Sequence, residues 1–389
     1  MPGIRFLQEG GSFVREPLKQ GRPGVQGIGP LRDINADDGA RRFTHGPAAM
    51  QSAPVSVRNW LIVVAAMIFL MIVLGALTRL TESGLSMVEW RPVTGWLPPL
   101  SEPAWQAELQ KYLSSPQGRL INRGFGVDDF KQIFWLEYLH RLWGRLIGVV
   151  FALPLAWFWL SGRLTPALKP RLLALLVLGG MQGALGWVMV ASGLVDRPAV
   201  SHYRLAGHLA LAIALYAYTV WLILQLGPQR DRHDDPATRR HSTILILWLF
   251  VVLIWGALMA GLRAGASHNT FPTMSGYWIP PGLFELSPWW VNLFENGTTI
   301  QFIHRWLAIL LALAILLLAW RTPQTETVAA GAMALLQLCL GIATILTGVD
   351  IALATTHQAG AVVLLTLLVV VRHRTTPSRQ SPVSVILRP

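Results

Sequence analysis

The chain has 389 residues but a single cysteine and few charged residues, which make up 13% of the sequence. One cysteine cannot form an intrachain disulfide, and it excludes zinc and iron–sulfur sites that need several cysteine ligands. Cys339 lies in an apolar run, where a small buried residue is the ordinary interpretation. Soluble proteins carry roughly 25% charged residues, so the scarcity of charge argues against a soluble protein.

Apolar residues are abundant instead, at 53% of the chain. Several apolar runs reach the ~20 residues that cross a bilayer as a helix, so the sequence predicts an all-α polytopic membrane protein. Eight runs qualify as transmembrane helices: residues 59–78, 132–160, 171–191, 203–226, 243–262, 299–320, 327–347 and 352–371. The net charge of +12 is attributed to membrane orientation rather than to nucleic acid, because no soluble domain is left to bind nucleic acid.

Positive charge is unevenly distributed among the connections between these runs. Arginine and lysine gather after the second, fourth and sixth runs and in the tail, whereas the fifth and seventh connections hold few. The positive-inside rule then places both termini in the cytoplasm of a bacterial inner membrane. The long connections at residues 79–131 and 263–298 face the periplasm. Both are rich in Pro, Gly and Trp, and we expect them to lie across the outer membrane surface.

Residues 1–57 are polar, rich in Gly and Pro, and carry both signs of charge. They lack the apolar core of a secretory signal, and they contain more acids than a transit peptide does. We expect this segment to be disordered, with Met50 as an alternative start of translation. Residues 373–389 are expected to form a cytoplasmic tail.

The first four runs resemble the last four. The segment "YLHRLWGRL" at residues 138–146 aligns with "FIHRWLAIL" at residues 302–310, and Gln182 in the third run aligns with Gln337 in the seventh. Four spans per repeat is an even number, so both repeats share one orientation in the membrane.

These matches predict two pseudo-symmetric four-helix bundles. The first would cover residues 58–227 and the second residues 243–372, with a cytoplasmic linker at residues 228–242.

Four histidines occupy matched positions in the repeats: His140, His208, His304 and His357. Each lies within about two turns of the outer end of its run, roughly 8–10 Å below the membrane boundary. Four-helix bundles hold cofactors between inward-facing side chains on facing helices. Two facing imidazoles per bundle suit the opposite axial positions of a haem iron, whereas the alternative is a set of hydrogen-bonded core histidines.

The residue four places after each histidine is small: Gly144, Ala212, Ala308 and Ala361. That position stacks next to the imidazole on the same helix face, where a flat macrocycle needs room. Small residues are also common in membrane helices in general. Non-haem iron fits less well, because a di-iron carboxylate site needs Glu-x-x-His on two helices and only Glu137 and His140 provide that motif.

Glu137 precedes His140 by three residues and therefore shares its helix face. Gln301 holds the matched position before His304, and an amide cannot exchange a proton. We therefore expect chemistry in the first half and electron transfer in the second. Glu137 would accept a proton or stabilise a cationic intermediate, whereas the alternative is a structural ion pair with Arg141, four residues further on.

Four arginines near the outer ends of the runs are candidates for binding a cofactor: Arg141, Arg145, Arg204 and Arg305. Haem propionates are anionic and point to the polar boundary, where a guanidinium binds a carboxylate through two hydrogen bonds. The alternative is that these side chains reach towards lipid headgroups.

Two segments of the chain, "LTRLTESGLSMVEWRPVTGWLPPL" at residues 77–100 and "FKQIFWLEYLHRLWGRLIG" at residues 130–148, resemble the haem A synthase family in its mitochondrial and alphaproteobacterial form. The resemblance extends over residues 58–372. It implies an oxidoreductase that converts the C8 methyl group of haem O to a formyl group for cytochrome oxidase biogenesis. Two successive hydroxylations would give a gem-diol that loses water.

The resemblance also assigns the two halves. It implies that haem O, the substrate, binds in the first half near His140, His208 and Glu137. A permanent haem b would be ligated by His304 and His357 in the second half. Some family members carry a cysteine pair in the first outer connection, which this chain lacks.

The expected partners are the lipid membrane, the haem O synthase (a farnesyltransferase) that supplies the substrate, an electron donor and a further copy of the chain in a homo-oligomer. Two other functions remain open at this stage. A quinol-linked two-haem cytochrome b would need the same four histidines, and a haem transporter or chaperone would not need a permanent second haem.

Overall fold

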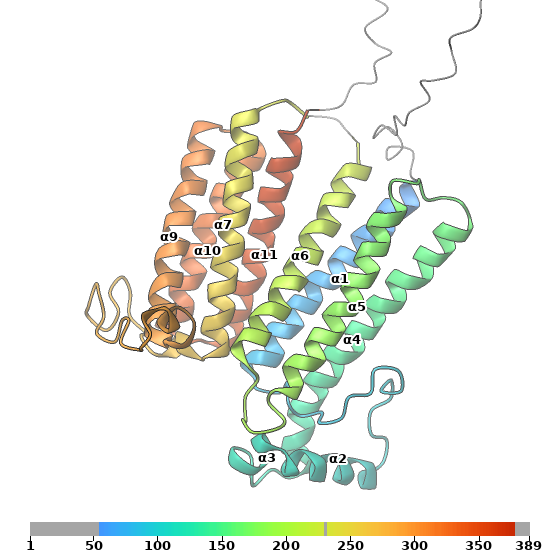
Figure 1. The fold of residues 1–389 in the computed structure, drawn as a ribbon, viewed down its shortest axis with the longest axis vertical. Helices are drawn as coiled ribbons and strands as arrows, with labels where there is room; N and C mark the ends of the chain where they lie inside the picture. Colours follow the sequence, from blue (N-terminus) through green and yellow to red (C-terminus); the bar gives the residue numbers. More distant parts are fainter. Residues whose placement is uncertain (1–53, 229–231, 378–389) are drawn as a thin grey trace, which may run out of the picture. The chain divides into compact units, whose positions relative to one another are not determined.

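The computed structural model describes residues 54–228 and 232–377 (Figure 1). Eight helices of this part are long and apolar enough to cross a membrane: α1 (Val55–Leu80), α4 (Val127–Leu160), α5 (Lys169–Ala191), α6 (His202–Leu226), α7 (Pro236–Gly261), α9 (Gly297–Arg321), α10 (Thr325–Leu346) and α11 (Ile351–Arg374). The described residues form no β-strand. The predicted all-α membrane protein with eight spans is therefore confirmed.

Several predictions concern residues at the ends of the chain. The segment expected to be disordered lies outside the described residues as far as residue 53, and Met50 lies outside them too. The predicted tail is described only as far as residue 377. Of the predicted cytoplasmic linker, residues 229–231 are likewise outside the described part.

Polar side chains cap the starts of three spans, α7, α9 and α11. α7 begins at Pro236, seven residues before the apolar run at 243, and the carboxylate of Asp235 accepts a hydrogen bond from the Thr238 amide at 3.0 Å. Asp350 caps α11 in the same way, by accepting from the Leu353 amide at 3.0 Å. Such caps satisfy amides that have no partner inside the helix. The sequence therefore shows the apolar length of each span better than its ends.

Each half of the chain arranges its four spans as a ring of neighbours. In the first half α1 packs against α4 and α6, and α5 packs against the same two helices. In the second half α7 packs against α9 and α11, and α10 packs against the same two. Among the described residues, α4 and α6 are not a closely packed pair, nor are α9 and α11. These helices therefore face each other across the interior of each ring, and all four candidate histidines lie on them.

The two halves meet along α1 and α6 on one side and α7 and α11 on the other (Figure 1). Tyr216 and Thr366 share a hydrogen bond of 2.9 Å across this boundary, and Gln358 donates to the carbonyl of Ile72 at 3.0 Å. One cluster of buried apolar side chains continues through both halves. The predicted two-fold relationship between the halves remains a prediction.

The connection between α1 and α4 contains two helices that the sequence did not predict, α2 (Glu102–Ser114) and α3 (Pro116–Leu120). Trp105 and Tyr112 of α2 are buried against Phe130 and Phe134 near the start of α4. The ring centroids of Trp105 and Phe134 are 4.9 Å apart, edge to face. Aromatic contacts of this kind stabilise beyond the area that they bury, so this connection has a small core of its own at the end of the first half where α4 begins.

The connection between α7 and α9 contains one short α-helix, α8 (Asn292–Glu295), and two 3₁₀ helices, η2 (Ala264–Ala266) and η3 (Trp289–Val291). The buried amide of Asn292 holds the chain that precedes it, since it donates to the carbonyl of Leu286 at 2.7 Å and to that of Trp289 at 2.9 Å. Hydrogen bonds of Asn292 thus hold the connection after α7, whereas packed aromatic side chains hold the connection after α1.

Candidate functional site

His140 on α4 is held by α1. Its Nδ1 lies 3.3 Å from the hydroxyl oxygen of Thr78, and that hydroxyl donates its own hydrogen to the carbonyl of Leu74 at 2.8 Å. The Thr78 oxygen is therefore left to accept a hydrogen bond from Nδ1–H. This tautomer leaves a free lone pair on Nε2, the atom that an axial haem ligand uses.

His304 on α9 adopts the same tautomer as His140, with a different hydrogen-bond acceptor. Its Nδ1 lies 3.2 Å from the backbone carbonyl oxygen of Val252 on α7. A carbonyl can only accept, so Nδ1 carries the hydrogen and Nε2 again has a free lone pair. A second partner that fixes tautomer and orientation is the usual arrangement for a histidine that binds a metal.

The other two histidines are each held by a glutamine from the preceding helix. Gln182 of α5 donates to the backbone carbonyl of His208 at 3.0 Å, and its Nε2 lies 3.2 Å from the ring Nδ1. Gln337 of α10 makes the same two contacts with His357, at 2.7 Å and 3.1 Å. The matched glutamines of the two repeats therefore have the same role, which is to fix an imidazole.

A glycine lies against each imidazole. A Cβ added to Gly186 or Gly341 would come within 2.9 Å of Cε1 of His208 or His357. The matching distances are 3.1 Å for Gly256 against His304 and 3.4 Å for Gly75 against His140. No larger residue would fit at Gly186 or Gly341 without moving the ring, because real Cβ contacts are not that short. The structure thus provides four imidazole positions, each packed against a glycine.

Each half carries two imidazoles on opposite helices. His140 and His208 lie on α4 and α6, which face each other across the first bundle, and His304 and His357 lie on α9 and α11, which face each other across the second. The described residues contain no group of three or more His, Cys, Asp and Glu side chains that could hold a metal ion. Two imidazoles per half suit the two axial positions of a haem iron, and ligation by these histidines stays a prediction.

Glu137 is buried, with 2% of its surface exposed, and both of its carboxylate oxygens have partners. Its carboxylate forms an ion pair with Arg141 and accepts hydrogen bonds from the Ser86 hydroxyl and the Met87 amide, both at 2.7 Å. These partners join α4 to the connection that follows α1. The structural ion pair with Arg141, the alternative that the sequence left open, is therefore present.

Gln301, at the matched position of the second half, is also completely buried. Its amide donates to the carbonyls of Gly265 and His268, at 3.2 Å each. The connection after α1 thus offers hydrogen-bond donors to a carboxylate, whereas the connection after α7 offers acceptors to an amide. Part of the Glu/Gln difference therefore follows from the polarity of the neighbouring backbone and not from chemistry.

The four candidate arginines donate to backbone carbonyls, three of them in the connections that follow α1 and α7, and Arg204 in the last turn of α5. Arg141 donates to Met87 at 2.6 Å and to Glu89 at 2.9 Å. The other three behave alike: Arg305 donates to His268 at 2.5 Å and Thr270 at 2.7 Å, Arg145 to Arg91 at 2.6 Å and Pro92 at 3.1 Å, and Arg204 to Val188 at 2.7 Å. Their predicted contact with haem propionates stays a prediction.

An ion-pair network joins α2 to the chain that follows α1. Lys111 of α2 lies 2.8 Å from the carboxylate of Glu89 and 2.9 Å from that of Glu108. The hydrogen bond from Lys111 holds the pKa of Glu89 below its ordinary value. Because the Glu89 carbonyl accepts from Arg141, this network connects α2 to the residue that pairs with Glu137.

Sequence reasoning missed several residues that position the histidines. The sequence pattern did not predict the contacts of Thr78, the Val252 carbonyl, Gly75 and Gly256 with the imidazoles. The available signal was the repeat itself, since Gly75 and Gly256 begin the matching segments "GALTRL" and "GALMAGL". Thr78 has no such signal, because the aligned residue is Met259.

The chain is similar in sequence to one protein family and to individual proteins named heme A synthase. The sequence profile of a family described as a cytochrome oxidase assembly protein matches residues 58–369. The heme A synthase of Rhodospirillum centenum is 48% identical over 342 residues, which cover 85% of this chain and 91% of that protein. The heme A synthase of Parvibaculum lavamentivorans is 47% identical over 309 residues, covering 78% and 90%. The matched span contains all four candidate histidines.

Proposed function

Because the chain belongs to the cytochrome oxidase assembly protein family, we propose that it acts in the membrane as a haem A synthase, an oxidoreductase that converts haem O to haem A. The observation that carries this function is the similarity to heme A synthases over most of the chain, at 48% and 47% identity. The eight apolar helices agree with a lipophilic substrate in the membrane. The reaction would convert the C8 methyl group to a formyl group by two successive hydroxylations.

We assign the substrate, haem O, to His140 and His208, and a permanent haem b to His304 and His357. Two features support bound haem in both halves. Each pair lies on helices that face each other across the interior of its bundle, and each imidazole packs against a glycine, which at Gly186 and Gly341 leaves no room for a side chain. Haem b in the second half would supply a one-electron redox centre. We assign the first site to the predicted domain at residues 58–227 and the second site to the predicted domain at residues 243–372.

Glu137 is the acidic group that we assign to the first site. Its carboxylate is held by Arg141, Ser86 and the Met87 amide, so its first function is to fix the connection after α1 beside His140. Proton uptake by Glu137 would require the contact with Arg141 to open. The arginines Arg141, Arg145, Arg204 and Arg305 lie at the outer ends of the spans, and we assign them to the propionate side of the two haems.

We also place the haem sites towards the periplasm, with both termini in the cytoplasm. The support is the excess of arginine and lysine in the connections at the opposite ends of the spans, which the positive-inside rule assigns to the cytoplasm. The haem O synthase, an electron donor and a homo-oligomer remain the proposed partners.

The proposed function is tested by expression in a host that makes haem O but has no haem A synthase of its own. Chromatography of the extracted pigments should show haem A, and haem b should be present in the purified protein. His304→Ala should remove the haem b while leaving the folded chain in the membrane. Haem b alone at two per chain, with no haem A or hydroxylated intermediate, would support the electron carrier instead and refute the synthase.

A further inference from the structure

The two halves differ in how two of their spans pack together. In the second half α9 packs tightly against α10, whereas the matched helices of the first half, α4 and α5, are in much looser contact. α4 carries His140, and α5 carries Gln182, which holds His208. The loose packing therefore lies beside one pair of imidazoles and not beside the other.

Two glycines mark the loosely packed wall of the first half, Gly148 on α4 and Gly179 on α5. Both are exposed, and a Cβ added to either would meet nothing within 4 Å. The repeat aligns them with Ala312 on α9 and Ala334 on α10. These alanines are 5% and 1% exposed and belong to the buried cluster that runs through both halves. The same two positions are thus open in the first half and filled in the second.

Both glycines face the interior of their bundle. Gly148 precedes the buried Phe151 by three residues, and Gly179 follows the buried Leu175 by four. Residues three or four apart share one face of a helix. Gly179 also precedes by seven residues Gly186, which packs against an imidazole. An inward position is ordinarily covered by the neighbouring helix, so exposure of both glycines means that the wall between α4 and α5 is open there.

The open wall lies close to the candidate haem site. Gly148 follows His140 by eight residues, and Gly179 is seven residues from Gly186. At 1.5 Å per residue these separations are roughly 12 Å and 10 Å. Both are measured towards the connection that joins α4 to α5, because α4 ends and α5 begins there. The two glycines therefore lie at a similar depth, one short step below the two imidazoles.

The wall is apolar along its whole length. Residues 146–160 of α4 and 172–191 of α5 contain no charged side chain. Val149 and Leu176, near the two glycines, are 39% and 36% exposed, which places them against lipid in a membrane. A charged group is costly at this depth, so a molecule that passes between α4 and α5 has to be apolar there.

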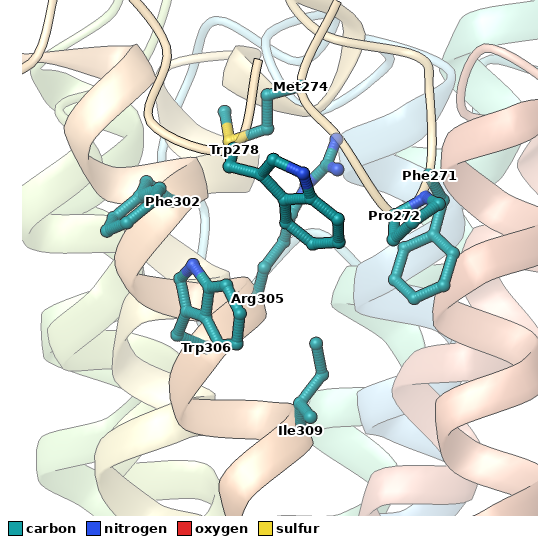
Figure 2. A pocket seen from close by; sticks show the side chains of 8 residues that line it. All are labelled: Phe271, Pro272, Met274, Trp278, Phe302, Arg305, Trp306 and Ile309. Carbon is teal, nitrogen blue, oxygen red and sulfur yellow. The ribbon is translucent and has the colours of Figure 1, made fainter. Parts of the chain in front are cut away.

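The pocket found in the second half is of another kind. Figure 2 shows it beside α9, beneath the connection that joins α7 to α9, with Phe302 and Trp306 in its lining. Its volume is about 40 Å³, room for roughly three water-sized groups. A chain of several five-carbon units does not fit in that volume, so this pocket is no counterpart of the open wall.

We propose that the isoprenoid tail of the substrate haem passes between Gly148 and Gly179 into the bilayer, and that substrate and product use this wall to enter and leave the first half. In the second half Ala312 and Ala334 close the matched wall, which suits a haem that has no such tail and stays bound. This inference rests on the proposed function, which assigns the tailed haem to the first half. A phospholipid acyl chain has the same chemistry as the tail, and the test separates the two.

The test compares two haems that differ in the tail. The purified full chain, with its own haem b in place, is titrated in nanodiscs with haem O and with added haem b, and the Soret absorbance reports binding. Gly148→Leu and Gly179→Leu fill the wall from either side. Each should weaken the binding of haem O relative to haem b by roughly tenfold or more, because overfilled space has to be vacated for the tail. Equal weakening of both haems would show damage to the site itself and would overturn the proposal.

Gly180→Leu is the matched control. Gly180 is also exposed with nothing within 4 Å of an added Cβ, but one residue turns it about 100° away from Gly179. It aligns with Leu335 of α10, which is 52% exposed, so a leucine suits this lipid-facing position. Gly180→Leu should therefore bind both haems as the wild type does.

An acyl chain in the wall would give a different result. The two leucines would then displace lipid, and the ratio of the two haem affinities would equal that of Gly180→Leu; this outcome overturns the proposal. Retained haem b in the second half and unchanged thermal unfolding report that each variant is folded. An unchanged ratio with continued haem A formation would refute this inference alone, whereas a wild type that forms no haem A from haem O would refute the proposed function.

Discussion

Replacing Gly341 with alanine tests the idea that the glycines shape the imidazole positions. The new Cβ would lie 2.9 Å from Cε1 of His357, too close for the ring to stay in place. Overfilling a packed site costs typically 1–3 kcal/mol, and each 1.4 kcal/mol is tenfold in affinity. We therefore expect haem to bind roughly 5- to 150-fold more weakly in the second half.

The same substitution should not weaken the helix itself. Alanine is favoured over glycine inside a helix by about 1 kcal/mol, so α10 should be as stable as before or more so. The assay is the haem b content of the purified chain, followed by the rate of haem transfer to excess apomyoglobin. Thermal unfolding of the same samples reports whether the fold has survived.

Two matched variants make this prediction refutable. A Cβ at Gly183 on α5 has nothing within 4 Å, and a Cβ at Gly75 would be an ordinary 3.4 Å from His140. Both glycines lie in the first half, so Gly183→Ala controls for the substitution alone, and Gly75→Ala should leave haem binding by His140 and His208 unchanged. If Gly341→Ala retains haem as well as Gly183→Ala does, the glycine does not shape the site and the reasoning is wrong.

Three further perturbations follow from the contacts of the first half. Glu137→Gln leaves Arg141 without its ion-pair partner, so pigment chromatography should show no haem A while haem b stays; full haem A formation would contradict both proposed roles of Glu137. Ser86→Ala removes one hydrogen bond to Glu137 and should lower the unfolding free energy by about 1–3 kcal/mol, and an unchanged melting temperature would contradict this. Glu89→Gln should destabilise the protein at neutral pH but not in acid, because the depressed pKa of Glu89 gives stability that is lost as pH falls through the folded-state pKa; a difference in melting temperature that does not change with pH would refute the ion pair.

The spans could be predicted from the sequence because a bilayer requires about 20 consecutive apolar residues, and this requirement is local. The predicted run at 203–226 differs by one residue from the start of α6. The predicted ends of the spans were less accurate where a capping side chain extends the helix, as Asp235 does at the start of α7. α2 was not predicted because its amphipathic surface is buried against Phe130 and Phe134, a contact that no local pattern contains.

The histidines of the candidate site were identifiable because the repeat presents each position twice. A single histidine in a span, such as His304, does not by itself indicate a haem ligand. Its alignment with His140 makes it hard to explain both positions as isolated core residues. Their partners could not be derived in this way. Thr78 and the Val252 carbonyl hold the two rings through different chemical groups, and a backbone carbonyl leaves no trace in the sequence.

The sequence by itself determined an eight-span helical protein with a histidine on four of its spans, because apolar length and repetition are written along the chain. Only the tertiary structure decided what each polar group contacts. Glu137 and Gln301 differ by a single charge in the sequence, and that difference alone suggested chemistry. In the fold, Glu137 accepts from the Met87 amide and Gln301 donates to the Gly265 carbonyl. The polarity of the backbone that happens to lie opposite is a property of the folded chain, and it determines which of the two side chains can be buried there.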